Sequence, residues 1–298
     1  MTQKQPILCI GAVLWDVIGH GLHRMTEGRD IPGRIAHHPG GVALNVAIAL
    51  ARHGLRPAVL GAVGCEPEGD ALCRAAETLG VETGWLLRRA DLPTDTYMAI
   101  EDPDGLIAAI ADAHSLEEAG DTILSPLMDG RLASAANPWP GVAVLDGNLT
   151  TDLLARISTL PELSRADLRV VPASPGKADR LLPLIRAGRG CFYLNRYEAQ
   201  VLAGRPLADA AEAAQAVLAL GAPRVIVTDG AEMVAEAATG RPLLRETPPQ
   251  VTIARVTGAG DAFLAAHLAA ETRGASPADA LARATRAAAD HVSGKDHP

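Results

Sequence analysis

The segment RVTGAGDAFLAAHL, residues 255–268, places an acidic side chain where a glycine-rich turn enters an apolar helix. The glycines leave the N–H groups of Gly258, Ala259 and Gly260 free to converge at the helix start, where the helix dipole also favours an anion. An acidic chain can in this way hold a phosphate that gains charge in a transition state. Asp261, in the first turn, can accept the proton of the oxygen that attacks this phosphate, and we expect the dipole to keep it ionised and weakly basic. The alternative is an aspartate that caps its own helix.

A second glycine pair precedes another helix in HPGGVALNVAIALARHG, residues 38–54. Gly40 and Gly41 allow a substrate to approach the backbone, and Asn45, one turn inside, offers a donor and an acceptor to hydroxyl groups. Asp16, just beyond the first expected strand, is a further candidate for sugar hydroxyls. These residues are equally consistent with a tight strand-to-helix turn and a turn-forming aspartate.

Two further polar groups follow expected strands. In LNRYEAQVLAG, residues 194–204, Asn195 and Glu198 stand three apart at a helix start, a spacing that suits Mg²⁺-bound water and phosphate oxygens. The same pair is also a capping box, and the local sequence does not separate the two interpretations. In VIVTDG, Thr228 and Gly230 lie at the carboxyl end of a strand, where ligands bind in open α/β sheets.

Short apolar runs alternate with alanine-rich segments along the chain. The expected strands are 7–13, 141–147, 168–173 and 223–230, and the expected helices are 42–54, 68–80, 177–188 and 207–221. Continuous apolar strands that alternate with helices predict a parallel sheet covered on both faces, which is an α/β fold.

Residues 94–112 break this alternation. Two strand-like runs flank the turn Asp102-Pro103-Asp104-Gly105, which predicts a small antiparallel element that projects as a lid over one end of the sheet. The segment 21–41 reads as a loop that belongs with the lid. Because nothing resembles a linker, we predict one domain over 1–298, with lid elements around 14–39 and 94–112.

Composition limits the classes of function. With 48% hydrophobic and 21% charged residues the chain is typical of a globular protein, and a net charge of −8 with 3% aromatics argues against nucleic-acid binding. The four cysteines, Cys9, Cys65, Cys73 and Cys191, have no CxxC spacing, so we expect free thiols. No signal-peptide pattern and no apolar run of about 18 residues is present, which predicts a cytoplasmic protein without a membrane partner.

In this order and spacing, the segments resemble the ribokinase-like, or PfkB, family of carbohydrate and nucleoside kinases across essentially the whole chain. HPGGVALNVAIALARHG looks like the family's N-terminal signature and VTGAGDAFLAAHL like its C-terminal one, while NRYE matches its N-x-x-E and VTDG its T-x-G nucleotide element. The resemblance implies a three-layer α/β/α sandwich with a β-lid over the acceptor site, and ATP-dependent phosphotransfer.

The resemblance also implies roles. Asp261 would be the catalytic base and Gly258, Ala259 and Gly260 the anion hole. The implied nucleotide residues are Asn195, Glu198 (which would hold magnesium through water), Thr228 and Gly230, and the implied acceptor residues are Asp16, Gly40, Gly41 and Asn45. ATP and Mg²⁺ are the implied cofactors, with K⁺ a further candidate at the loops that flank the anion hole.

Within the family, TDTYMAIEDPDGLIAAIAD is similar to the pseudouridine kinase branch, as are VLDGNLT, PASPGKA and the valine at position 256. This implies transfer of the γ-phosphate to the 5′-hydroxyl of pseudouridine, read by Thr94, Tyr97, Asp112, Asp146 and Asn148. The chain departs from the branch at Leu44, Ala113, Val171 and Leu194. The alternatives are a kinase for ribose, another sugar or another nucleoside, and, more remotely, a non-catalytic nucleotide-binding protein. An exposed hairpin lid could also pair two subunits into a homodimer.

Overall fold

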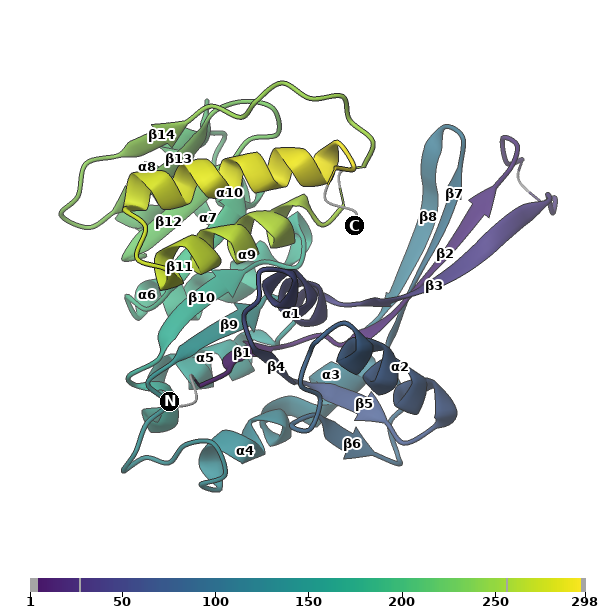
Figure 1. Ribbon diagram of the computed structural model, residues 1–298, viewed down its shortest axis with the longest axis horizontal. Helices are drawn as coiled ribbons and strands as arrows, with labels where there is room; N and C mark the ends of the chain where they lie inside the picture. The colour runs from purple at the N-terminus through teal and green to yellow at the C-terminus, as the bar shows by residue number, and fades with distance from the viewer. Residues whose placement is uncertain (1–4, 27, 256, 296–298) are drawn as a thin grey trace.

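The computed structural model describes residues 5–26, 28–255 and 257–295. Its main sheet has eight strands in the order β14-β13-β12-β11-β10-β9-β1-β4 (Figure 1). Their bounds are β1 Ile7–Ile10, β4 Pro57–Leu60, β9 Val142–Asp146, β10 Asp167–Val171, β11 Cys191–Asn195, β12 Arg224–Thr228, β13 Val234–Ala238 and β14 Leu244–Glu246. Neighbours from β12 to β4 are parallel, as predicted, whereas β13 and β14 add an antiparallel edge.

Helices cover both faces of this sheet. One face packs against α1 Val42–Arg52, α2 Pro67–Thr78, α9 Ala259–Thr272 and α10 Pro277–Val292. The other packs against α3 His114–Ala119, α4 Ser125–Met128, α5 Thr151–Thr159, α6 Leu182–Arg186, α7 Arg196–Ala203 and α8 Ala210–Ala219. Alternate residues of each strand contribute to the two cores: Leu8 and Ile10 belong to one, and Ile7 and Cys9 to the other. This is the three-layer α/β/α arrangement that the sequence predicts.

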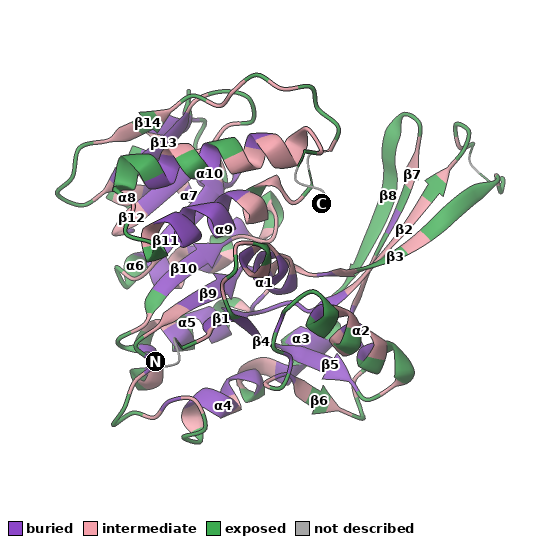
Figure 2. Ribbon diagram, viewed as in Figure 1, coloured by how far each residue is buried: buried purple, intermediate pink, exposed green. Residues whose placement is uncertain are grey.

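The lid is a separate four-stranded sheet in the order β3-β2-β7-β8, which projects from the body of the molecule (Figure 1). Its strands are β2 Leu14–Gly21, β3 Gly33–Gly40, β7 Thr96–Asp102 and β8 Gly105–Asp112. Most of its residues are exposed or half-buried, in contrast to the buried main sheet (Figure 2). Two short strands, β5 Ala62–Gly64 and β6 Leu87–Arg89, form a further pair beside it.

Two sequence predictions are wrong in detail. The loop expected at 21–41 contains strand β3, whose sequence GRIAHHPG lacks alternating apolar residues; it is held by pairing to β2, and its Pro39 is tolerated because β3 is an edge strand. The helix expected at 177–188 begins as a 3-10 helix, Pro175–Leu181, and only then continues as α6, with a proline in the first turn of each piece. Among the described helices, none is long and apolar enough to cross a membrane.

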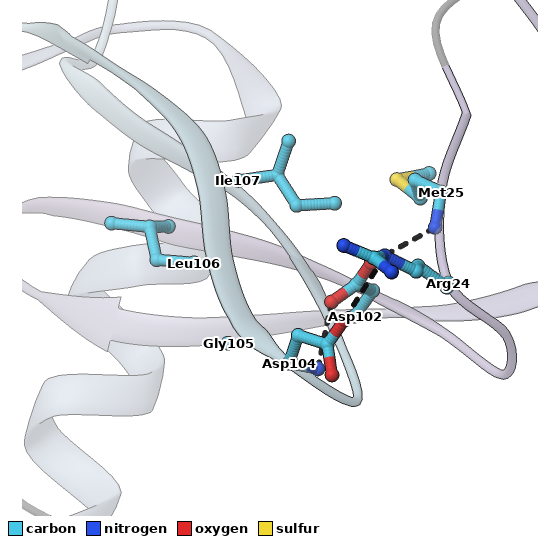
Figure 3. Close-up of a pocket in the computed structure, with 7 residues that line it drawn as sticks. All are labelled: Arg24, Met25, Asp102, Asp104, Gly105, Leu106 and Ile107. Atoms are coloured by element: carbon cyan, nitrogen blue, oxygen red, sulfur yellow. Dashed lines mark hydrogen bonds and ion pairs between the residues drawn. The ribbon is translucent and has the colours of Figure 1, made fainter.

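The tips of the two lid hairpins are joined around a small cavity of about 230 Å³ (Figure 3). The Met25 N–H donates to the Asp102 carboxylate at 2.9 Å, and Arg24 pairs with Asp104 at 3.2 Å. The 3-10 helices Gly120–Leu124 and Pro161–Leu163 complete the described secondary structure.

Candidate active site

The glycine-rich turn enters α9 as predicted. Gly258 is the N-cap with φ of 85°, a left-handed conformation that favours glycine, and the first N–H groups of α9 are those that a helix leaves without intrahelical partners. Within the described part of the chain, the Asp261 carboxylate makes no hydrogen bond to a helix N–H, so the alternative of a helix-capping aspartate is wrong. Val256, which supported the resemblance to one branch, lies outside the described residues.

Three carboxylates from distant parts of the chain meet near this turn. Burial, and after it the negative charges of Asp146 and Asp16, raise the pKa of Asp261 to about 7. Burial likewise raises the pKa of Asp16 to about 6, although the neighbouring His38 acts in the opposite direction. The expectation that the helix dipole keeps Asp261 weakly basic is therefore wrong, because desolvation and two nearby acids outweigh the dipole. A carboxylate with a pKa near neutrality suits general-base work at neutral pH.

The glycine pair before α1 is required by close packing. A Cβ at Gly40 would lie 2.2 Å from the Asp16 carboxylate, and one at Gly41 would lie 2.4 Å from the Ala12 carbonyl oxygen. Gly41 also has φ of 91°. The structure therefore supports the tight-turn interpretation and at the same time places this turn against Asp16. Asn45 lies half-buried one turn into α1, and its N–H donates to the Gly41 carbonyl at 2.8 Å.

Asp146 organises the site from the end of β9. Its side chain is 0% exposed, and its carboxylate accepts hydrogen bonds from the Ala12 N–H at 2.8 Å and the Asn148 N–H at 2.7 Å. A further bond comes from the Ala43 N–H in the first turn of α1 at 3.3 Å. Burial raises the pKa of Asp146. Since this carboxylate has no exposed surface, we expect it to act by fixing α1 and the β1–β2 connection.

Asn148 connects Asp146 to a residue that the sequence analysis left without a role. Its amide donates to Asp146 at 3.3 Å, and its Oδ1 accepts from Lys177 Nζ at 2.8 Å. Lys177 belongs to PASPGKA, a segment noted only for its resemblance to one branch of the family. A lone lysine after a strand carries little signal until the fold sets it beside Asn148.

The nucleotide candidates lie at the carboxyl ends of two paired strands. Asn195 ends β11 and is in register with Thr228, which ends β12. Asn195 and Glu198 form a full capping box: Oδ1 accepts from the Glu198 N–H at 2.9 Å, and Oε2 accepts from the Asn195 N–H at 2.7 Å. Gly230 follows in the turn with φ of 60°. The capping alternative is thus confirmed, and the part these residues take in nucleotide binding stays a prediction.

Glu198 also fits a magnesium-binding role. It is 7% exposed, and burial raises its pKa to about 7. Magnesium in phosphotransfer sites is held by one or two carboxylates together with water and substrate phosphates. Within the described ranges, no group of three or more His, Cys, Asp or Glu side chains is placed to hold a metal by itself, which is compatible with that mode of binding.

The lid residues divide into two groups. Tyr97 is in register with Asp16 across β2 and β7, so the two side chains share one face of the lid. Asp112 is in register with Thr96 and so points to the other face, where it bonds His114 Nδ1 at 2.7 Å. Thr94 is 9% exposed, and its hydroxyl accepts from the Gly64 N–H at 3.1 Å. The structure places Tyr97 on the same face of the lid as Asp16 and engages Thr94 and Asp112 elsewhere, and their predicted contact with an acceptor stays a prediction.

Comparisons with known proteins identify the family of the chain. The family model described as pfkB family carbohydrate kinase matches residues 4–295. A pseudouridine kinase from Escherichia coli is 27% identical over 269 residues, which is 89% of this chain and 83% of that protein. A carbohydrate kinase from Agrobacterium tumefaciens has a similar structure, with 26% identity, a TM-score of 0.82 and coverage of 99% of this chain and 94% of the other.

Ribokinase from Arabidopsis thaliana, solved with ribose and ATP, shares the fold at 19% identity, with a TM-score of 0.79 and coverage of 97% and 93% of the two chains. The match to the family model across almost the whole sequence is the decisive observation. The chain belongs to the PfkB family of carbohydrate kinases and is a phosphotransferase with an alcohol group as acceptor.

Proposed function

We propose that this kinase transfers the γ-phosphate of ATP to the 5′-hydroxyl of pseudouridine. The observation that carries the chemistry is the position of Asp261, with a pKa raised to about 7, in the first turn of α9, a helix whose N-cap is Gly258 in a left-handed conformation. The pseudouridine kinase relative and the lid sequence support the choice of acceptor.

The proposed step is a phosphoryl transfer from ATP to the acceptor hydroxyl. The acceptor oxygen forms a bond to the γ-phosphorus while the bond from that phosphorus to the β–γ bridging oxygen breaks, which leaves ADP. Asp261 accepts the hydroxyl proton, and the N–H groups of Gly258, Ala259 and Gly260 stabilise the negative charge on the transferring oxygens. Magnesium, when bound near Glu198, supplies further charge neutralisation. Asp16 and Asn45 hold the sugar hydroxyls, while Asn195, Thr228 and Gly230 contact the nucleotide.

A competition assay tests the acceptor. At fixed ATP and Mg²⁺ the enzyme is offered pseudouridine, uridine, adenosine, ribose and fructose 6-phosphate, and the rates of ADP formation give kcat/KM for each. We expect the highest value for pseudouridine, and an advantage over uridine shows that the C-linked base is read. A higher kcat/KM for ribose or another nucleoside contradicts the assignment of pseudouridine as the acceptor. The proposed kinase chemistry would still hold if D261N abolished turnover of that other acceptor.

We also propose that a second copy of this chain covers one face of the lid. Four exposed apolar side chains form two adjacent rows on that face: Ile35, Met98, Ile100 and Ile110 are 73%, 46%, 37% and 69% exposed. The register sets them on the face opposite Asp16 and Tyr97. Strands β3, β7 and β8 contribute these side chains. Such a patch can pack against the same patch of a second subunit about a two-fold axis.

A further inference from the structure

The turn that leads into α9 is fastened to the C-terminal end of α10. The N–H groups of Ala254 and Arg255 donate to the Val292 carbonyl at 2.8 and 3.1 Å, and Arg255 Nε donates to the His291 carbonyl at 3.2 Å. Figure 1 shows the end of α10 beside the start of α9. Helix α10 therefore holds the turn that forms the proposed anion hole, although α10 contributes no N–H group to that anion hole.

The His291 side chain contacts Thr257, the residue before Gly258. Its Nε2 lies 2.8 Å from the Thr257 carbonyl oxygen, and its Nδ1 lies 3.3 Å from Arg255 Nη2. A guanidinium can only donate a hydrogen bond, so Nδ1 is the acceptor and the proton of the neutral ring is on Nε2. The carbonyl can only accept, which agrees with this tautomer. Arg255 thus sets the imidazole to donate to Thr257.

The direction of the Thr257 carbonyl determines the direction of the next N–H group. A trans peptide is planar, so the carbonyl of Thr257 and the N–H of Gly258 point in opposite directions. The imidazole also lies against Gly258, because a Cβ built there would be 3.1 Å from Nε2 and 3.2 Å from Cε1. With the carbonyl held toward α10, the Gly258 N–H points away from α10 and cannot turn over without loss of the hydrogen bond.

We propose that His291 is a positioning residue that holds the Thr257–Gly258 peptide in the orientation required by the anion hole, with Arg255 selecting its tautomer. This inference rests on the proposed role of Gly258, Ala259 and Gly260 in phosphoryl transfer. It assigns a function to the C-terminal end of α10. None of the residues proposed to bind the acceptor or the nucleotide lies there.

Four variants test the proposal. H291L removes the donor; H291N can accept from Arg255 and does not reach Thr257; H291Q carries an amide N–H at the position of Nε2 and keeps the donor. H53L, at the C-cap of α1, is the matched control for loss of a half-buried histidine. We expect kcat to fall about 10- to 100-fold in H291L and H291N with the KM for ATP changed less than threefold, to recover in H291Q, and to stay at the wild-type value in H53L.

A second readout separates this proposal from the proposed function. Binding of MgADP with aluminium fluoride, a mimic of the transferring phosphoryl group, should weaken in H291L and H291N by the same factor as kcat, while binding of MgADP alone is unchanged. Equal kcat in H291L, H291Q and wild type overturns the inference and leaves the kinase function intact.

If the wild-type protein phosphorylates none of the acceptors, the proposed function fails. A comparison of H291N with H291Q by the NMR shift and the hydrogen exchange of the Gly258 amide then decides the positioning role. Thermal melts of all variants identify any that fails to fold. If H291L does not fold, the two polar replacements H291Q and H291N still test the proposal.

Discussion

Asp261 shows how the chemistry of one residue depends on charges that are remote in sequence. Asp16 comes from the lid and Asp146 from the end of β9, and both raise the pKa of Asp261. A carboxylate with a raised pKa is a stronger base, and a base of this kind is what proton transfer from a hydroxyl requires.

The pH dependence of catalysis follows from this cluster. The proposed base must be ionised to accept a proton, so kcat/KM should rise with pH through the pKa of Asp261, which is about 7 in the free enzyme. D16N removes one of the neighbouring negative charges and should shift this rising limb to lower pH, in addition to weakening acceptor binding. Normalised pH–rate profiles of wild type and D16N check this, and a shift to higher pH would contradict the electrostatic coupling.

The raised pKa of Asp261 also lowers the free energy of unfolding at neutral and higher pH. The pKa of Asp261 rises from 3.8 to about 7 on folding, so between these values the folded state binds a proton that the unfolded state has lost. Stability must therefore decrease as pH rises through this window. We expect D261N to lose at least about 100-fold in kcat yet to be more stable than wild type by about 1–3 kcal/mol at pH 8, with the difference vanishing near pH 4. Urea unfolding at both pH values measures this, with D30N as the control in an exposed loop.

The glycine pair gives a prediction about the acceptor alone. G40A forces a methyl group into the Asp16 carboxylate, whereas G84A adds one in open space. We expect G40A to raise the KM for the acceptor more than about tenfold with little change for ATP, because Asp16 is displaced and the nucleotide residues are not. Steady-state kinetics with each substrate varied checks this. An unchanged acceptor KM in G40A would remove Asp16 from the acceptor site.

Among the secondary-structure elements, those of the lid were the hardest to predict from the sequence. The hairpin of β7 and β8 could be predicted because Asp102-Pro103-Asp104-Gly105 is strong local turn chemistry. Strand β3 could not, since GRIAHHPG has neither period-two alternation nor β-branched enrichment, and only its partner β2 makes it a strand. The site shows the same division: Asp261 and Asn195 were found from turn and capping signals, whereas Lys177 and His291 gain their neighbours only through tertiary packing.

The apolar face of the lid predicts the state of association. We expect wild-type protein to be a dimer at micromolar concentration and the double variant I35D/I110D to be a monomer, because two charges per subunit would be buried against apolar side chains. Size-exclusion chromatography with light scattering measures the mass. L79D, a charge at a 40% exposed leucine at the C-cap of α2, is the matched control and should remain a dimer. A monomeric wild type contradicts the proposal.

Helix α9 is held at both ends. The residue before its N-cap, Thr257, contacts His291 at the end of α10, and in its last turn Glu271 accepts from Arg169 and Arg224, each at 2.6 Å. These arginines also bond Asp167 and Glu236, so one buried ionic network joins α9 to β10, β12 and β13. The helix that carries Asp261 is thereby fixed to β12, whose carboxyl end carries Thr228, and to β10 and β13 of the same sheet.

Loss of Glu271 should therefore be costly. E271Q removes one of the two carboxylates that face each of two largely buried guanidinium groups, and we expect a loss of about 1–3 kcal/mol in the free energy of unfolding. D91N, which breaks an exposed ion pair with Arg89, should cost less than about 1 kcal/mol. Denaturant unfolding of both variants checks this, and equal losses would show that the network contributes no more than a surface pair.

The joined tips of the lid have a mechanical consequence. Strands β2 and β7 pair in parallel through the middle of the lid, and Asp102 with Met25 and Asp104 with Arg24 tie its far end. We therefore expect the two hairpins to move together, as one rigid unit, about their attachment near Leu14, Gly40, Thr96 and Asp112. Because Gly40 leads directly into α1, we expect any such movement to shift the helix that carries Asn45, and so to couple the proposed sugar site to the position of the lid.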